Sequence, residues 1–253
     1  MTMSQSFDLV IRGGTIVNHD GIFEGDIGIR DGRIARIGAI GDASAAEEFD
    51  ARGLHVFPGV IDSHVHFREP GGEAKEDLES GSRAAVTGGV TAVFEMPNTN
   101  PMTVTREALA DKVKRATDRM FCDFAFFPGA TKDNIGLLPE LEQMPGAAGV
   151  KVFMGSSTGN LLVDDPELLR ELLSKVRRRV SFHCEDEARL NARKDLQVEG
   201  DPASHSVWRD PEAAVMATRI LLGLARETSA RVHILHVSTG AEMALIAANR
   251  DHA

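Results

Sequence analysis

Two histidines spaced two residues apart, His64 and His66, stand in the segment 61–72, IDSHVHFREPGG, and an arginine, Arg68, follows them. On a β-strand, residues two apart point to the same side, so both imidazoles would face one site. Two imidazoles on one face can bind a divalent ion such as zinc. A bare His-x-His pair can equally be one core and one surface histidine, so further ligands are needed to decide.

Single histidines recur late in two other apolar segments, His183 in SFHCED and His236 in ILHVST. A buried neutral histidine needs a hydrogen-bond partner. Four histidines at the same end of one fold are hard to explain as unrelated core residues. We therefore interpret His64, His66, His183 and His236 as metal ligands.

A lysine, Lys151, lies inside the apolar segment AGVKVFMG. A lysine in an apolar strand costs free energy unless it is paired or neutralised. One interpretation is a lysine whose ammonium group reaches solvent at the strand end. The other is a lysine with a lowered pKa that reacts with carbon dioxide. The resulting carbamate has two oxygens, which could bridge two cations held by the histidines.

The elements that position these residues alternate between strand and helix after residue 55. The candidate strands are 55–67, 90–97, 121–130, 148–155, 180–186 and 231–239, and the candidate helices are 75–89, 105–119, 164–179 and 211–229. The strands are mostly continuous apolar runs, which is typical of buried parallel strands. Because polar residues recur near the carboxyl ends of the strands, a (β/α)8 TIM-type barrel is favoured over an open sheet, which would spread them along an edge.

Before residue 55 the pattern differs, with short β-like pieces at 7–18, 21–39 and 46–59 and a hairpin turn signal at Asp31-Gly32. We predict a small β-sandwich domain over 1–54 and a barrel over 55–253. Six strands do not close a barrel of eight, and two further units of roughly 65 residues would be needed. The sequence therefore predicts an incomplete barrel.

Composition excludes several partner classes. The 253 residues carry a net charge of −10, which argues against nucleic acid or an anionic membrane as partner. There is no run of about 18 apolar residues that could span a membrane. The N-terminal segment lacks the pattern of a secretory signal. The two cysteines, Cys122 and Cys184, are interpreted as free thiols, so we expect a cytoplasmic protein.

The ligand pattern resembles the amidohydrolase superfamily: HVH late in a first barrel strand, a lysine in the fourth, and single histidines in the fifth and sixth. Within it, HVHFREPG, EMPNTNP, GVKVFMGSSTGNLLVDD and FHCEDEARL are similar to dihydroorotase over essentially the whole chain. The resemblance implies a metal-dependent hydrolase of pyrimidine biosynthesis that reversibly opens dihydroorotate to N-carbamoyl-aspartate. It also implies two zinc ions per subunit, bridged by N6-carboxylated Lys151.

In this interpretation Arg68 and Asn98 hold the substrate carboxylate, since a guanidinium pairs with a carboxylate through two parallel donors. Alternatively, Arg68 makes a structural pair with Glu69 or Asp62. Arg68 also distinguishes dihydroorotases from neighbouring families. Allantoinases resemble the pattern H-x-H-x-N-E-P-G, with asparagine at the position of Arg68, and hydantoinases lack the Arg-Glu-Pro run. Another cyclic amidohydrolase of allantoinase or hydantoinase type, and an inactive dihydroorotase-like subunit, stay open as alternatives.

The resemblance places the general base, an aspartate, on an eighth strand that this sequence does not contain. Asp251, in the terminal Asp-His-Ala, follows His236 too closely for a seventh unit to intervene, so it is rejected as a substitute. His205 is expected to be an exposed loop histidine, and the glycine-serine loop 155–160 is a weak candidate for a segment near the site. The family further implies a homodimer, or association with a transcarbamoylase.

Overall fold

The computed structural model describes residues 6–155 and 159–253. These form two compact units, Met1–Val60 and Ile61–Ala253, where the sequence suggests 1–54 and 55–253. Residues 156–158, most of the glycine-serine loop that the sequence singles out, lie outside the described residues.

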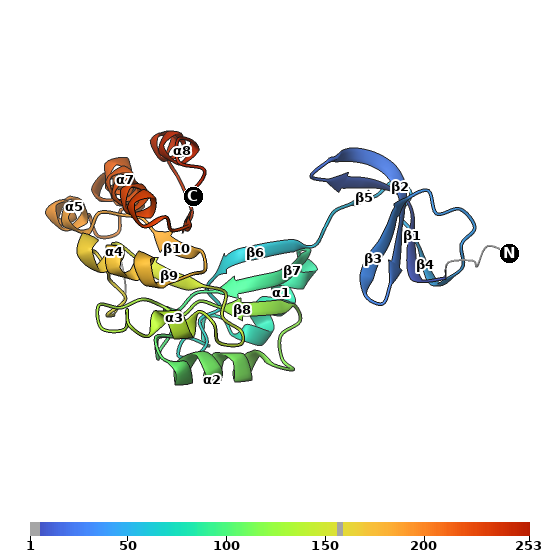
Figure 1. The fold of residues 1–253 in the computed structure, drawn as a ribbon, viewed down its shortest axis with the longest axis horizontal. Coiled ribbons are helices and arrows are strands. Elements are labelled where there is room, and N and C mark those ends of the chain that lie inside the picture. Colours follow the sequence, from blue (N-terminus) through green and yellow to red (C-terminus); the bar gives the residue numbers. More distant parts are fainter. Residues whose placement is uncertain (1–5, 156–158) are drawn as a thin grey trace. The chain divides into compact units, whose positions relative to one another are not determined.

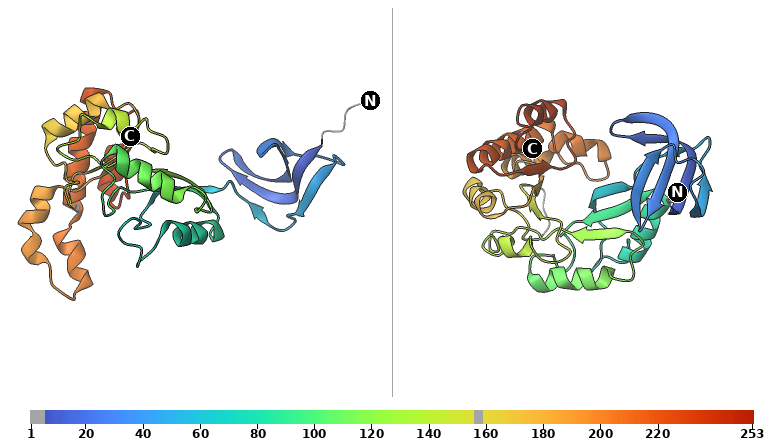
Figure 2. Two further views of the ribbon diagram at one scale, coloured as in Figure 1. Left: turned by 90° about the horizontal axis from the view of Figure 1, so that it is seen from below. Right: turned by 45° about the vertical axis from the view of Figure 1, so that its right-hand side comes forward.

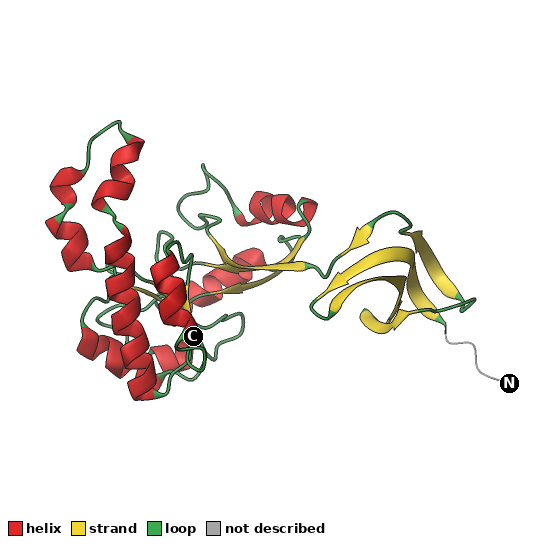
Figure 3. Cartoon of the chain, turned by 90° about the horizontal axis from the view of Figure 1, so that it is seen from above, coloured by secondary structure: helices red, strands yellow, loops and turns green. Residues whose placement is uncertain are grey.

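In the described part of the first unit, residues 6–60, the regular elements are strands (Figure 3). Its five-stranded sheet has the order β3-β2-β1-β4, with β5 also pairing with β1. The bounds are β1 (Phe7–Asn18), β2 (Gly21–Arg30), β3 (Arg33–Gly38), β4 (Ala45–Asp50) and β5 (His55–Val56). Asp31 and Gly32 join β2 to β3 with φ of 51° and 68°, as a two-residue hairpin turn requires. The predicted hairpin is confirmed.

The second unit contains two three-stranded sheets, β6-β7-β8 and β11-β10-β9. The strands are β6 (Val60–Val65), β7 (Val90–Glu95), β8 (Asp123–Phe126), β9 (Val150–Phe153), β10 (Val180–His183) and β11 (Val232–Ile234). The parallel bridges Phe126↔Ala147 and Gly129↔Lys151 link the end of β8 to β9. The strands therefore follow one another in chain order, which Figure 1 shows from β6 in cyan to β10 in orange.

Helices connect successive strands, as the repeated strand–helix pattern predicts, and α8 follows the last strand, β11. They are α1 (Leu78–Thr87), α2 (Arg106–Ala116), α3 (Leu138–Leu141), α4 (Pro166–Lys175), α7 (Pro211–Thr228) and α8 (Gly240–Ala247). α4 begins as its sequence indicates: Asp165 accepts from the backbone N–H of Glu167 at 2.8 Å, and Pro166 occupies the first turn. Its leucines Leu169, Leu172 and Leu173 are buried.

The prediction of one strand over 55–67 is wrong. β5 ends at Val56 and pairs with β1, whereas β6 begins at Val60 and joins the barrel strands. Pro58 and Gly59 separate them, and proline cannot donate a ladder hydrogen bond.

A second difference is the segment 187–210, which we call the extension. It contains α5 (Glu187–Ala192), η1 (Lys194–Leu196), η2 (Pro202–Ser204) and α6 (His205–Trp208). In the left view of Figure 2 it projects, in orange, away from the strands of its unit. The sequence predicts no element here, because elements of three to six residues are too short to show a hydrophobic period.

The main core of the second unit lies between β9, β10 and β11 and the helices α4 and α7. Phe182 is fully buried there, and Cys184 is buried at the end of β10. Both Cys122 and Cys184 are free thiols, as expected. Within the described ranges, no helix is long and apolar enough to cross a membrane. Asp251 lies in a turn after α8 and on no strand.

Candidate metal centre

The His-x-His pair stands at the carboxyl end of β6. The Nε2 atoms of His64 and His66 lie 3.1 Å apart, and both side chains are half-buried. The two imidazoles therefore face a common site, as residues two apart on a strand should.

The other two histidines come from the neighbouring ends of β10 and β11. Nδ1 of His183 lies 3.0 Å from Nε2 of His236. The ring of His236 also packs against that of His64, with 5.2 Å between centroids, so the two pairs are contiguous. His236 has a φ of 38°, a left-handed conformation that is rare for a residue other than glycine and recurs at functional sites.

The environment keeps the imidazoles of His64, His66 and His236 neutral. Burial, with smaller contributions from nearby Lys151 and the other histidines, lowers the pKa of His64 to about 3. Burial and His183 lower the pKa of His236 to about 4. The pKa of His66 is lowered as well, again chiefly by burial. A neutral imidazole is the form that binds a metal ion.

Lys151, in β9, is the most unusual group in the unit. Its side chain is 0% exposed, and Nζ has no hydrogen-bond partner within residues 6–155 and 159–253. The interpretation of a lysine that reaches solvent is therefore wrong. Burial lowers the pKa of Lys151 to about 7, so a large share of the amine is unprotonated near neutral pH. An unprotonated amine is the form that can add carbon dioxide.

The donor set fits divalent cations. Two nitrogen ligands of a tetrahedral zinc ion are about 3.3 Å apart when each bond is about 2.05 Å. The observed separations of 3.1 Å and 3.0 Å in the two histidine pairs are close to that value. In the described part of the chain no three His, Cys, Asp or Glu side chains converge as a ligand group. Lys151 does, however, lie near enough to contribute to the lowered pKa of His64 and of His236, and its buried amine has no hydrogen-bond partner among the described residues.

Asn98 and Arg68 lie beside His66 and differ in what they contact. Oδ1 of Asn98 lies 2.8 Å from Nδ1 of His66, so Asn98 accepts from this imidazole and directs its Nε2 toward His64. The side chain of Arg68 is exposed, and its guanidinium forms no hydrogen bond or ion pair with any described residue.

The structural partners considered for Arg68 are engaged elsewhere. The carboxylate of Glu69 accepts from Arg119 at 2.9 Å and 3.1 Å, and Asp62 accepts from the backbone N–H of His64 at 3.1 Å. The pairing of Arg68 with Glu69 or Asp62 is therefore wrong for this structure. Its guanidinium stays available to a ligand.

Two residues that the sequence analysis did not single out contact this centre. Oε2 of Glu185 lies 2.5 Å from Nε2 of His183, and Glu185 forms an ion pair with Arg209. Burial opposes ionisation of Glu185, but hydrogen bonds from His183 and Arg209 outweigh it and lower the pKa to about 2. The motif FHCED contained Glu185, but no sequence signal connects it to an arginine 24 residues away.

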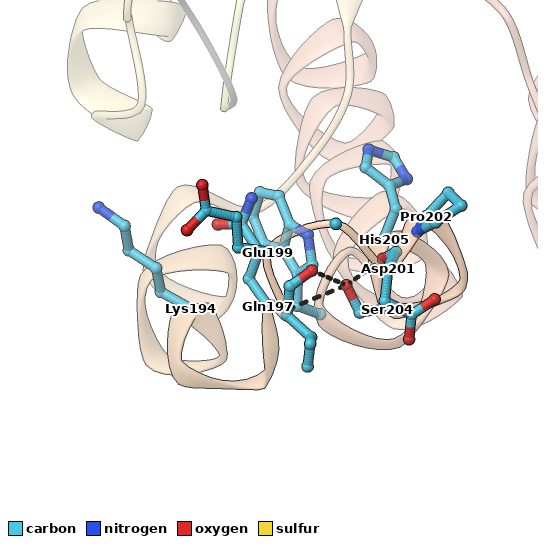
Figure 4. A pocket seen from close by; sticks show the side chains of 10 residues that line it. Lys194, Gln197, Glu199, Asp201, Pro202, Ser204 and His205 are labelled. Carbon is cyan, nitrogen blue, oxygen red and sulfur yellow. Dashed lines mark hydrogen bonds between the residues drawn. The ribbon is translucent and has the colours of Figure 1, made fainter.

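The cavity beside His183 and His236 is lined in part by the extension. His205, Ser206 and Arg209 line it together with both histidines. His205 is exposed, as expected, but it also borders this cavity. A separate hollow within the extension, shown in Figure 4, runs from Lys194 to Trp208, and there Ser204 Oγ accepts from the backbone N–H of Val198 at 3.0 Å.

Comparison with known proteins identifies the family. The sequence profile described as amidohydrolase family matches residues 55–252. The chain belongs to the amidohydrolase family. The profile of the urease alpha-subunit N-terminal domain matches residues 1–56. The strands and helices of residues 61–253 are thus those of an incomplete amidohydrolase barrel.

Relatives of this chain carry the names allantoinase and hydantoinase. The chain is 37% identical to an allantoinase of Rubrobacter xylanophilus over 97% of its length, and 34% identical to an allantoinase of Deinococcus radiodurans over 95%. An L-hydantoinase (dihydropyrimidinase) from Arthrobacter aurescens superposes on 96% of the chain with a TM-score of 0.88 and 30% identity. These names support the cyclic-amide branch and do not support dihydroorotase specifically.

The chain covers 56% and 55% of the two allantoinases and 56% of the hydantoinase chain. It therefore spans about half the length of the relatives that it matches.

Proposed function

We propose that the protein containing this chain hydrolyses a C–N bond of a cyclic amide at a centre of two divalent cations. The observation that supports this most strongly is the gathering of four histidines and one buried lysine at adjacent strand ends. His64 and His236, at its two extremes along the chain, have rings 5.2 Å apart. Neutral imidazoles and a carbamate are suitable ligands for zinc, which is the cation that we propose.

The residues that would hold the cations are His64, His66, His183, His236 and the carboxylated amine of Lys151. When bound, the cations supply Lewis acidity toward the amide carbonyl and an activated water near neutral pH. Asn98 keeps Nδ1 of His66 protonated, which leaves Nε2 free as a ligand. Lys151 must lose its proton before it can add carbon dioxide, and its burial favours that loss.

Two further roles concern the ring and the proton. Arg68 lies two residues after His66, and its unpaired guanidinium can orient a polar or anionic ring at the centre. The proton moved during ring opening requires a general base. By family resemblance this base is an aspartate on a strand that the chain does not contain.

A neutral ureide or hydantoin ring is the first candidate substrate, because the relatives are named allantoinase and hydantoinase. Dihydroorotate is the second candidate, and the unpaired Arg68 is the specific observation that favours it. Guanidinium pairs well with a carboxylate, which dihydroorotate carries and hydantoin lacks. This second candidate would place the protein in pyrimidine biosynthesis. Cytoplasmic location, a homodimer and association with a transcarbamoylase stay predictions.

The test is to supply zinc and bicarbonate to the purified protein and to measure ring opening of allantoin, hydantoin and dihydroorotate side by side. Turnover of any ring supports the proposal, and the preferred ring selects the substrate class. Zinc bound in the expected amount without turnover of any of the three would contradict these substrates. Absence of bound zinc under replete conditions would favour the inactive-subunit alternative.

A further inference from the structure

We propose that Glu185 and Arg209 are a positioning pair that fixes the tautomer and orientation of His183, and thereby sets the affinity of the centre for its cation. This inference rests on the proposed function, because it treats His183 as a ligand. It assigns a role at the centre to Arg209, which lies in the extension, whereas none of the proposed metal ligands does.

The contact between Glu185 and His183 determines which imidazole nitrogen carries the proton. The carboxylate of Glu185 can only accept, because it is ionised and paired with a guanidinium. Nε2 of His183, 2.5 Å away, must therefore donate. The lone pair of a neutral His183 then lies on Nδ1, the atom that faces His236 at 3.0 Å. A ligand nitrogen with its other N–H on a carboxylate is a common way to orient metal-binding histidines.

Arg209 in turn holds the carboxylate. Its Nε donates to Oε1 of Glu185 at 2.9 Å, and its Nη2 donates to Oε2, so both oxygens are engaged. The side chains of Glu185 and Arg209 are only 14% and 22% exposed, so the pair is weakly screened by solvent. Without Arg209, the carboxylate could rotate away from His183.

The extension holds Arg209 in place. The guanidinium lies 5.7 Å from the ring of Trp208, and its Nη1 lies 3.5 Å from Nε2 of His205. A second bidentate pair in the extension, Arg189 with Asp210, makes no contact with Glu185. That pair provides a matched control: it tests whether loosening the extension alone is enough to affect His183.

The first experiment uses the metal-free chain labelled with ¹⁵N-histidine, and reads the tautomer of His183 by long-range ¹H–¹⁵N correlation. The wild type is expected to show the Nε2–H form alone. Glu185→Gln keeps the shape but offers an amide that can donate to Nε2, so we expect a mixture with the Nδ1–H form. Arg209→Met should give a smaller shift in the same direction, Arg209→Lys should partly restore the wild-type form, and Arg189→Met should leave it unchanged.

The second experiment titrates Co²⁺ against a chromophoric chelator. Loss of an orienting partner lowers metal affinity about 10- to 100-fold. We expect that loss in Glu185→Gln and Arg209→Met, and less than a twofold change in Arg189→Met. Near-wild-type circular dichroism checks that each variant folds, and Arg209→Gln replaces Arg209→Met if the methionine variant does not fold.

The outcomes separate the inference from the proposed function. An unchanged His183 tautomer in Glu185→Gln, or unchanged Co²⁺ affinity in both Glu185→Gln and Arg209→Met, overturns the positioning pair. An equal loss in Arg189→Met also overturns it, because a loosened extension would then be the cause. If the tautomer responds as expected but the wild type binds no Co²⁺, the control of the His183 tautomer by Glu185 and Arg209 stands, whereas the effect on cation affinity and the metal-dependent function both fail.

Discussion

Lys151 shows how a single residue can be costly for the fold and useful for chemistry. An amine that is buried without a hydrogen-bond partner destabilises the folded protein, because its hydration is lost and no hydrogen bond replaces it; the ring of Phe153, with its centroid 4.3 Å from Nζ, compensates only in part. Such a group stands out from ordinary core residues, and strongly perturbed groups cluster at functional sites. The cost is understandable if the amine is carboxylated in the active protein.

Replacing this lysine by an apolar residue of similar length should therefore separate stability from metal binding. In Lys151→Met we expect the free energy of unfolding of the metal-free protein to rise by about 2 kcal/mol, measured by urea titration. Binding of the cations should fall sharply in the same variant. Lys132→Met, at a half-exposed lysine paired with Asp164, is the control and should change stability by less than about 1 kcal/mol. Full metal binding by Lys151→Met would contradict a ligand role.

The effect of replacing Arg68 should show whether the substrate is a neutral or an anionic ring. If the substrate is dihydroorotate, Arg68→Ala should raise KM about 10- to 150-fold, because a charge-assisted pair contributes about 1.5–3 kcal/mol. If the substrate is allantoin or hydantoin, KM should change less than about twofold. Steady-state kinetics on each ring measures this. Arg83→Ala, on a surface pair with Glu79, is the control and should leave KM unchanged.

The sequence predicts those site residues that are marked by their spacing or by their immediate neighbours. His64 and His66 share a face because of their spacing, and Lys151 stands out because its neighbours in the strand are apolar. Glu185 and Arg209 could not be found in this way, since their pairing depends on how the extension folds back. Asn98 was assigned to a substrate carboxylate, and its contact with His66 shows an additional role that spacing cannot reveal.

Among the elements, α1 and α2 are tied to the loop that follows β6. The buried carboxylate of Glu69 accepts from Arg119 and from the backbone N–H of Leu78 at the start of α1. The side chain of Glu69 is 5% exposed and that of Arg119 is 38% exposed, so only the carboxylate end of this ion pair is shielded from water. The loop that carries Arg68 is thereby held against two helices.

Breaking that contact should be far more damaging than breaking a surface pair. Hydrogen bonds to a charged group contribute about 1.5–3 kcal/mol, so we expect a loss of roughly that size in Glu69→Ala, measured by urea unfolding. Glu79→Ala removes the exposed partner of Arg83 and should cost less than about 1 kcal/mol. Equal effects of the two substitutions would show that Glu69 does not anchor the loop.

Asp210 connects the extension to α7 and predicts a pH dependence. It accepts from the backbone N–H of Ala213 as the N-cap of α7. The hydrogen bond from Arg189 is the largest cause that lowers the pKa of Asp210. A carboxyl group whose pKa is lower in the folded state stabilises the fold above its unfolded pKa of about 3.9, and this stabilisation is lost as the pH falls through the folded pKa.

Asp210→Ala should therefore cost about 1–2 kcal/mol at pH 7, the usual effect of losing an N-cap. The difference in free energy of unfolding between Asp210→Ala and the wild type should become smaller below about pH 4. Urea unfolding at a series of pH values measures both effects. The exposed Asp195, also in the extension, provides the control, because Asp195→Ala should show neither. A deficit that is constant from pH 7 to pH 3 would contradict the assigned pKa direction.

Long elements were predicted well because their patterns are strong. The segment DDPELLRELL contains the cap, the proline and the leucine spacing of α4, and each is used as predicted. The prediction of one strand over 55–67 is wrong because an apolar run does not show where the chain leaves the sheet of β5 and enters the sheet of β6. The extension was missed because short helical turns depend on contacts rather than on period.

At the scale of the whole molecule, metal binding should stabilise one unit and not the other. A ligand present at about 100 times its Kd stabilises the state that binds it by about 2.7 kcal/mol. With zinc added, hydrogen exchange should slow in peptides from β6, β9, β10 and β11 and stay unchanged over residues 7–50. Chelation of zinc should reverse the effect. Equal slowing in both units would contradict a site confined to the second.

The contact between the rings of His64 and His236 has a consequence for biogenesis. These residues are joined by a long stretch of chain and come from the first and last of the six consecutive strands. A ribosome that adds about 5–20 residues per second exposes the first pair roughly ten seconds or more before the second can be made. If these histidines bind zinc as proposed, the nascent chain offers only the two-nitrogen site at His64 and His66 until β11 is made. Loading of the complete centre would then follow synthesis of β11.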